Sequence, residues 1–148
     1  MIPRDDPSLA ITHEVRDRCL CLHLQRAARA IARRFDGALR PLELTSGQFS
    51  LLMSLNRPQA PRLGDVATLL AMDRTTLTAN LKPLERRGLV EIRVDDRDRR
   101  SRRLGLTDAG RDLLVAAVPV WRDTHAEIDR LLPDGGPEHL RAELRALT

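Results

Sequence analysis

Three features of the sequence predict a mainly helical fold that carries a small β-hairpin wing. Apolar residues recur at helical spacing through most of the chain. Between residues 72 and 110, a polar-faced helix, a strand, an arginine-rich loop, a second strand and a further helix start follow one another. Long helical patterns at both ends carry more apolar surface than a chain of 148 residues readily covers by itself. Together they predict a winged helix-turn-helix joined to a helical dimerisation region.

The length and composition fit one domain, residues 1–148, and predict no second one. The net charge is +4, and arginine supplies every cationic side chain except Lys82. The two cysteines, Cys19 and Cys21, give no disulfide framework. No segment approaches the roughly 18 apolar residues that span a bilayer, and the amino terminus is charged rather than signal-like. The expected compartment is the cytoplasm.

A long first helix is predicted from Thr12 to Leu39, after a mobile arm of residues 1–11. A stripe of apolar residues keeps the three-to-four spacing of a buried face, and its members are Leu20, Leu24, Ala27, Ile31, Phe35 and Leu39. The segment 19–24 is apolar nearly all round, so it needs cover on more than one side. A partner subunit is the economical source of that cover. Burial of the helix within a monomer is the alternative.

The next two predicted helices have the spacing of a helix-turn-helix. Thr45 or Ser46 can cap a helix that runs to about Leu55, and a second helix is expected over 62–70. The residues expected to face inward are Phe49, Leu52 and Met53 in the first and Leu63, Val66, Leu69 and Leu70 in the second. A short turn at 71–72 leads on to a third helix, so the second helix would brace the third against a DNA groove.

This third helix has an apolar face and a polar face. It is expected to begin after the N-cap residue Asp73 and to end at Gly88, which can adopt the left-handed conformation that stops a helix. Leu77, Leu81 and Leu84 fall on one face, and Thr75, Thr78, Ala79, Lys82 and Arg86 fall on the opposite one. Short hydroxyl and basic side chains can approach a major groove closely. An ordinary amphipathic surface helix is the alternative. Pro83 predicts a bend or a tightened last turn.

The hairpin that follows is predicted to be a basic wing. Residues 89–94 and 102–106 have strand patterns, and residues 95–101 form the tip between them. Six arginines and three aspartates lie between Arg93 and Arg103. Arginine is favoured in the narrow, electronegative minor groove of DNA. A solvated, charge-rich hairpin is the alternative.

The carboxyl-terminal part is predicted to be helical. A long helix is expected from Asp108 to about Leu132, with a bend at Pro119. A break at 133–137 then precedes a short helix that ends at Leu147.

Several segments at fixed spacing resemble the MarR (multiple antibiotic resistance regulator) family. They are Asp98-Arg99-Arg100, Leu104 and Leu106-Thr107-Asp108-Ala109-Gly110 in the wing and the helix after it, and residues 73–78 and 84–90 in and after the third helix. The resemblance runs from about Cys19 to Trp121. It implies a dimeric winged helix-turn-helix transcription regulator, with dimerisation helices at 12–40 and 108–148 and a DNA-binding part at 45–107.

The expected partner is double-stranded DNA, because two Phe, one Trp and no Tyr offer little surface for stacking unpaired bases. The candidates for contacts with base edges and phosphates are Arg74, Thr75, Thr76, Thr78 and Asn80, with Lys82 on phosphate, Arg97 and Arg99 in the minor groove, and Asp98 bracing an arginine. Ala79 departs from the basic residue that many members of the family carry, and it can touch a thymine methyl instead. Two recognition helices about 34 Å apart would read a near-palindromic operator.

The resemblance further implies regulation by a small aromatic or phenolic ligand that relieves repression, or by an oxidant that acts through Cys19, with His23 nearby. The alternative for Cys19 and Cys21 is two small buried side chains. Cys19 and His23 alone are a weak signal for a metal site, so no metal and no cofactor are expected. The sequence contains no glycine-rich phosphate loop, nucleophile elbow or evident carboxylate pair, and no enzymatic activity is expected.

A second class of function stays open on sequence grounds. The same winged fold could serve as a protein-interaction module in which the wing and the polar helix grip an acidic partner. Sequence preference combined with salt dependence separates the two classes, because specific DNA binding exceeds binding to unrelated duplex by on the order of 1,000-fold or more.

Overall fold

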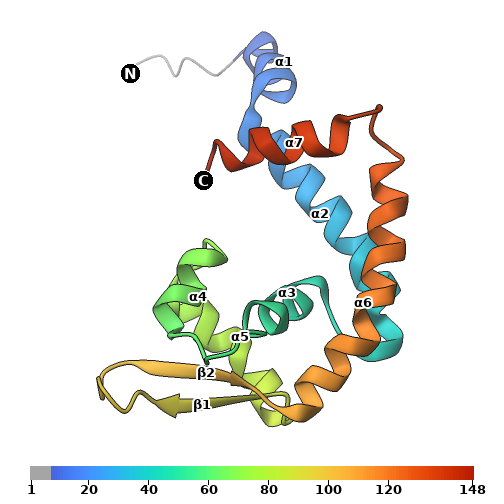
Figure 1. The fold of residues 1–148 in the computed structure, drawn as a ribbon. Coiled ribbons are helices and arrows are strands. Elements are labelled where there is room, and N and C mark those ends of the chain that lie inside the picture. Colours follow the sequence, from blue (N-terminus) through green and yellow to red (C-terminus); the bar gives the residue numbers. More distant parts are fainter. Residues whose placement is uncertain (1–7) are drawn as a thin grey trace, which may run out of the picture.

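The computed structural model describes residues 8–148 and contains a winged part from which long helices project (Figure 1). The elements in chain order are α1 (Leu9–Arg18), α2 (Leu20–Leu39), the 3-10 turn η1 (Arg40–Leu42), α3 (Ser46–Ser54), α4 (Leu63–Leu69), α5 (Arg74–Arg86), β1 (Val90–Val94), β2 (Arg102–Leu106), α6 (Asp108–Asp129) and α7 (Gly136–Arg145). The mainly helical fold with one hairpin is the predicted one. Of the predicted mobile arm, residues 1–7 lie outside the described part, while Leu9 to Ile11 already belong to α1.

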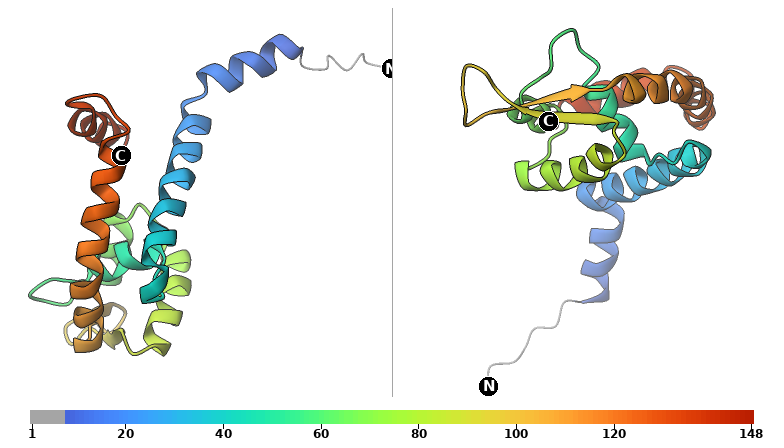
Figure 2. Two further views of the ribbon diagram at one scale, coloured as in Figure 1. Left: turned by 90° about the vertical axis from the view of Figure 1, so that its right-hand side faces the viewer. Right: turned by 90° about the horizontal axis from the view of Figure 1, so that it is seen from below.

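The single long first helix predicted from Thr12 to Leu39 is wrong, because the chain breaks at Cys19. That residue has an extended conformation, with φ −71° and ψ 106°, and separates α1 from α2. Its Sγ accepts a hydrogen bond from the backbone N–H of Leu22 at 3.5 Å, so the thiol caps α2. As a result α1 points away from the line of α2 (Figure 2).

The winged part is held together by local caps and one apolar core. Thr45 and Gln48 form a reciprocal capping box at the start of α3. The core includes Leu39, Leu52, Leu55, Val66, Leu77, Leu81, Leu84 and Leu104, all fully buried or nearly so. Leu69, which the sequence analysis places inside, is 58% exposed, because it lies at the end of the short helix α4.

The wing is more than a two-stranded hairpin. β1 and β2 pair antiparallel, with Val90 opposite Leu106 and Val94 opposite Arg102. An additional bridge joins Arg62 to Arg103, and the N–H of Leu104 donates to the carbonyl of Pro61 at 2.9 Å. The loop before α4 is therefore bonded to β2 through the backbone, and this contact fixes the wing to the body.

The helices at the two ends leave apolar side chains uncovered within one chain. α6 begins at Asp108 with Thr107 as N-cap and continues through Pro119, and α7 begins at Gly136, so the break between them is earlier than predicted. α2 packs against α6 (Figure 2). Only part of the apolar stripe of α2 is buried there, because Leu39 is fully buried while Leu20 is 69% and Ile31 37% exposed. Among the described helices, none is long and apolar enough to cross a membrane.

Candidate nucleic-acid interface

The position of α5 follows from its two ends and its apolar face. Asp73 caps the helix by accepting a hydrogen bond from the N–H of Thr76 at 2.7 Å, and this bond is the first cause of its lowered pKa. Leu77, Leu81 and Leu84 are fully buried, as the helical spacing predicts. The opposite face of α5 is therefore turned to solvent.

The structure groups most of the predicted contact residues of α5 on that outer face. Arg74, Thr75, Thr78 and Lys82 line one shallow hollow together with Ala79. Thr78 donates its hydroxyl hydrogen to the carbonyl of Arg74 at 2.8 Å, so its hydroxyl oxygen stays available as an acceptor. The outer surface thus offers two cations and two hydroxyls with no acidic side chain in the hollow.

Two predicted residues lie apart from this group. Thr76 donates its hydroxyl hydrogen to Asp73 at 2.7 Å, so it serves the helix cap. Asn80 lines a neighbouring hollow with Thr45 and Gln48, at the junction of α5 with the start of α3, and its Nδ2 lies 3.6 Å from Sδ of Met72. Of these two residues, only Asn80 lies on the exposed surface next to the outer face of α5.

The arginines of the wing divide into two sets. Arg93 pairs with Glu91, Arg103 pairs with Asp95 at 2.9 Å, and Arg102 donates to the carbonyl oxygens of residues 99 and 101. At the tip, the exposed side chains of Arg97, Arg99 and Arg100 have neither an ion pair nor a hydrogen bond within residues 8–148. The tip therefore presents three arginine side chains without an ion pair, next to the exposed acids Asp96 and Asp98, where the sequence analysis places Arg97 and Arg99.

Besides Glu91, which pairs with Arg93, the acid that contacts arginine side chains at the wing is Asp95, which the sequence analysis does not single out. Asp98, the predicted brace, accepts a hydrogen bond from the backbone N–H of Arg100 at 3.0 Å and shapes the turn instead. Asp95 lies among three donors: the backbone N–H of Arg97 lowers its pKa most, followed by the guanidinium groups of Arg103 and Arg62. Asp95 is consequently ionised at neutral pH.

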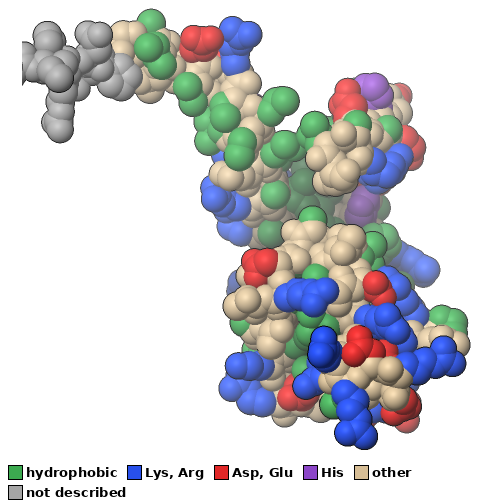
Figure 3. All heavy atoms as spheres, turned by 90° about the vertical axis from the view of Figure 1, so that its left-hand side faces the viewer, with side chains coloured by type: hydrophobic (Ala, Val, Ile, Leu, Met, Phe, Trp, Pro, Cys, Tyr) green, Lys and Arg blue, Asp and Glu red, His purple; other side chains and the backbone are tan. Residues whose placement is uncertain are grey.

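Arg62 is the second residue that sequence reasoning missed. Its Nε lies 3.2 Å from Oδ2 of Asp95. No local pattern signals this contact, because the two residues are far apart in sequence and meet only where the loop before α4 bridges to β2. Figure 3 shows the resulting distribution, with Lys and Arg side chains gathered over the lower, winged part and hydrophobic side chains along the upper helices.

The cysteine region has the geometry of a helix start. Cys19 is half-buried, whereas Cys21 is exposed, so the alternative of two buried cysteines is wrong for Cys21. Nδ1 of His23 lies 2.8 Å from the carbonyl oxygen of Cys19, not from its sulfur. Within residues 8–148, no group of three His, Cys, Asp or Glu side chains is placed to hold a metal ion.

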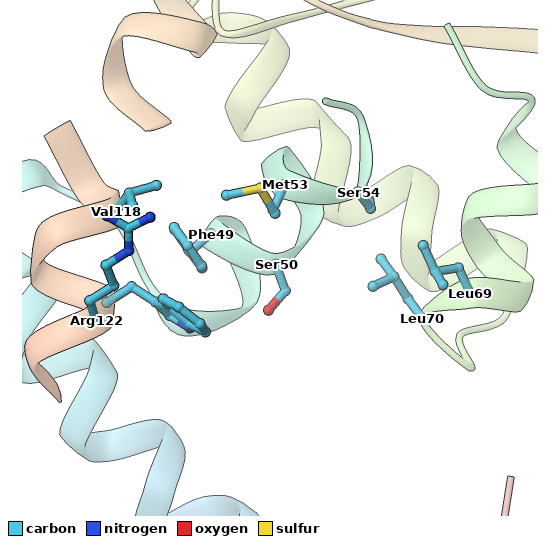
Figure 4. Close-up of a pocket in the computed structure, with 9 residues that line it drawn as sticks. Phe49, Ser50, Met53, Ser54, Leu69, Leu70, Val118 and Arg122 are labelled. Carbon is cyan, nitrogen blue, oxygen red and sulfur yellow. The ribbon is translucent and has the colours of Figure 1, made fainter. Parts of the chain in front are cut away.

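A largely apolar cavity of about 610 Å³ lies between α3, the end of α4 and α6 (Figure 4). Its lining residues are Phe49, Ser50, Met53 and Ser54 of α3, Leu69 and Leu70 at the end of α4, and Val118, Trp121 and Arg122 of α6. The rings of Phe49 and Trp121 stack with centroids 6.3 Å apart. Arg122 is the one charged residue of the lining, so the cavity suits a flat apolar group that bears a negative charge.

Comparison with known proteins gives the family. Residues 44–101, which include α3, α4, α5 and the wing tip, match the MarR family. The chain is also 36% identical to the transcriptional regulator MosR of M. tuberculosis, and its fold matches MosR in complex with DNA with a TM-score of 0.80 over 88% of this chain and 93% of MosR. The chain belongs to the MarR family.

Two further regulators of transcription are similar to this chain. BadR of Rhodopseudomonas palustris (strain ATCC BAA-98 / CGA009), a transcriptional activatory protein, is 33% identical over 113 residues, which are 74% of this chain and 65% of BadR. CouR, a transcriptional repressor bound to a 23-mer DNA duplex, is 30% identical with a TM-score of 0.79 over 90% of this chain and 94% of CouR. This chain spans 53% to 74% of the length of BadR and three other matching regulators.

Proposed function

We propose that this MarR-family chain is a sequence-specific regulator of transcription that binds double-stranded DNA as a dimer. The observation that carries the proposal is the pairing of two basic surfaces on one winged helix-turn-helix: the outer face of α5 and the wing tip at Arg97, Arg99 and Arg100. A recognition helix in a major groove and a wing arginine in the adjoining minor groove use such surfaces. MosR and CouR, whose folds match, have structures with DNA.

The proposed contacts follow the geometry. Arg74, Thr75 and Thr78 reach base edges and phosphates, and Lys82 reaches a phosphate, since all four lie on the outer face of α5. Asn80 extends this surface toward α3. Thr76 acts indirectly, through the cap that it shares with Asp73.

The dimer is proposed from apolar surface that one chain leaves open. Leu20, Leu24 and Ile31 on α2 and Leu140 and Leu144 on α7 are all between 37% and 69% exposed. A second copy of the chain would cover them, and the two recognition helices would then meet successive major grooves of a near-palindromic operator.

The direction of regulation proposed is repression that a small ligand relieves. The cavity of about 610 Å³ between α3, α4 and α6 supports this mechanism, because it adjoins Leu70, which leads through the turn at Ala71 directly into α5. A ligand there would bias the position of the recognition helix relative to the dimerisation helices. The stacked rings and Arg122 favour an aromatic carboxylate or phenolate as the effector. Oxidation of Cys19 is the alternative signal; it is removed if peroxide treatment leaves DNA affinity unchanged.

Selection of randomised duplex DNA on the purified protein tests the proposed function. We expect an inverted repeat that is bound on the order of 1,000-fold more tightly than a scrambled duplex at near-physiological salt. Arg99→Ala should weaken this binding roughly 5- to 150-fold without changing the fold or the oligomeric state. Equal, weak binding to all duplexes would instead favour the interaction-module function, with an acidic protein as partner.

A screen of small aromatic acids tests the effector site. The expected ligand raises the melting temperature of the protein and releases the selected operator. Ser50→Trp, which fills the cavity from its exposed side, should abolish the melting-temperature shift while operator binding persists. Arg122→Gln should weaken binding of acids more than binding of their uncharged amides. Equal losses for acids and amides would exclude a charge role for Arg122.

A further inference from the structure

We infer that Asp95 is a positioning residue for DNA binding: it locks the wing to the body of the winged part and thereby aims the arginines of the tip. The inference rests on the proposed DNA-binding function. An acidic side chain would then strengthen binding to DNA, although DNA itself is a polyanion.

The contacts of Asp95 account for both of its oxygens. Its side chain is only 4% exposed. Oδ2 accepts from Nε of Arg103 at 2.9 Å and from Nε of Arg62 at 3.2 Å. Oδ1 accepts from the backbone N–H of Arg97 at 2.9 Å, and the N–H of Asp95 itself donates to the carbonyl of Ser101 at 3.1 Å. Charge-assisted hydrogen bonds from two guanidinium groups hold this nearly buried carboxylate in one geometry.

These contacts join three segments that are separate in sequence. Arg62 belongs to the loop before α4, Arg103 belongs to β2, and Asp95 follows β1. Arg103 also donates from Nη1 to the carbonyl of Ala60 at 3.0 Å. The direction in which the tip leaves the strands is therefore set by Asp95, the first residue of the tip, one residue after the end of β1.

Asp95 also decides which arginines are free. By pairing with Arg62 and Arg103, it fixes two cations where the strands meet the tip, while Arg97, Arg99 and Arg100 extend from the tip itself. The same carboxylate accepts a hydrogen bond from the backbone N–H of Arg97, so the backbone of the first unpaired arginine is fixed in position. Pre-ordering of this kind lowers the entropy that the wing loses when it binds.

The chain offers a matched control in the same loop. Asp96 is an exposed acid of the tip, and it contacts no arginine side chain in the described part of the chain. Removing a negative charge from a DNA-binding surface ordinarily strengthens binding, because repulsion of phosphate falls. Charge alone therefore predicts the same sign for Asp95→Asn and Asp96→Asn, whereas positioning predicts the opposite sign for Asp95→Asn.

The experiment measures the affinity of the full-length parent, Asp95→Asn and Asp96→Asn for the selected duplex. Asp96→Asn should bind as tightly as the parent or more tightly. Asp95→Asn should bind roughly 10- to 100-fold more weakly, although its charge changes in the same direction. Hydroxyl-radical footprints should lose protection at the minor-groove positions of the wing and keep it beside α5. Tighter binding by Asp95→Asn, or uniform loss of the whole footprint, would overturn the inference.

A double-mutant cycle tests whether Asp95 acts through the tip. In a chain that already carries Arg97→Ala, Arg99→Ala and Arg100→Ala, Asp95→Asn should cost almost nothing further, because the residues that it aims are gone. Additive losses would overturn the inference. Should Asp95→Asn fail to fold by circular dichroism, Arg62→Gln is measured in the same two backgrounds with the same expectation. A parent that does not distinguish selected from scrambled duplex would overturn the proposed function itself.

Discussion

At the residue scale, Gly110 shows why the Leu-Thr-x-x-Gly segment ends in a glycine. Thr107 donates its hydroxyl hydrogen to the carbonyl of Gly88 at 2.6 Å, and its hydroxyl oxygen accepts from the N–H of Gly110 at 3.1 Å. The first turn of α6 therefore lies against the junction between α5 and β1. A Cβ at position 110 would come within 2.2 Å of the carbonyl oxygen of Leu89. The glycine in the Leu-Thr-x-x-Gly segment is needed because backbone meets backbone there.

Gly110→Ala should therefore lower the free energy of unfolding by about 1–3 kcal/mol, as overpacking of a buried contact does. Urea denaturation followed by circular dichroism measures the loss. Gly47→Ala is the matched control, because it also lies in the first turn of a helix and its Cβ would meet nothing closer than Thr45 Oγ1 at 4.0 Å. That control should be neutral or stabilising. Equal effects of the two substitutions would contradict the contact argument.

At the element scale, α5 is bracketed by two residues with left-handed backbone conformations. Gly88, after the helix, has φ 70°, and Ala71, in the turn before it, has φ 50°. A glycine adopts this conformation without a Cβ clash, whereas an alanine is strained by roughly 1–2 kcal/mol. The backbone is thus strained at Ala71, in the turn before α5, but not at Gly88, after the end of α5.

Replacing Ala71 by glycine and Gly88 by alanine should change the free energy of unfolding in opposite directions. Ala71→Gly should raise the free energy of unfolding by up to about 1 kcal/mol, since relief of strain exceeds the greater freedom of glycine in the unfolded chain. Gly88→Ala should lower the free energy of unfolding by about 1–2 kcal/mol, although nothing lies within 4 Å of the added Cβ. Thermal and urea unfolding report both changes. A destabilised Ala71→Gly variant would show that the methyl group of Ala71 has a packing role.

The elements that the sequence predicts well are those set by neighbouring residues. The start of α3 at Thr45, the span of α5 from Asp73 to Gly88 and both strands follow from caps, periodicity and turn residues, and they agree with the structure. The features that it misses depend on distant partners. No local pattern pairs Arg62 with Asp95 or reveals the break at Cys19, where a thiol takes the capping role usual for Ser, Thr, Asp or Asn.

The same division holds for the candidate site. Helical spacing brings Arg74, Thr75, Thr78 and Lys82 together on one face without any long-range information. The charge count of the wing locates a basic tip but does not distinguish free arginines from paired ones. That distinction requires Asp95, whose two cationic partners become neighbours only when the loop before α4 pairs with β2.

At the scale of the whole molecule, the exposed apolar surface has a distinct place. Basic side chains are concentrated on the winged part, whereas apolar side chains remain uncovered along α1, α2 and α7, beside the charged residues of these helices (Figure 3). Exposed apolar surface of this extent is typical of a protein–protein interface. The proposed dimer would use the upper helices for association and leave both winged parts free for DNA.

Replacement of Leu24 and Ile31 by Glu should therefore dissociate the dimer and leave the protomer folded. Each residue is 37% exposed in the single chain, so the charge costs little within the protomer but is buried against the partner. The dissociation constant of the dimer should rise roughly a hundredfold or more, measured by sedimentation equilibrium. Operator affinity should fall with it, because an isolated protomer reads only one half-site. Ala30→Glu, on the polar side of α2, is the control that should stay dimeric. If the double variant stays dimeric too, the subunits associate through Leu140 and Leu144 of α7 instead, and the same substitutions there become the decisive ones.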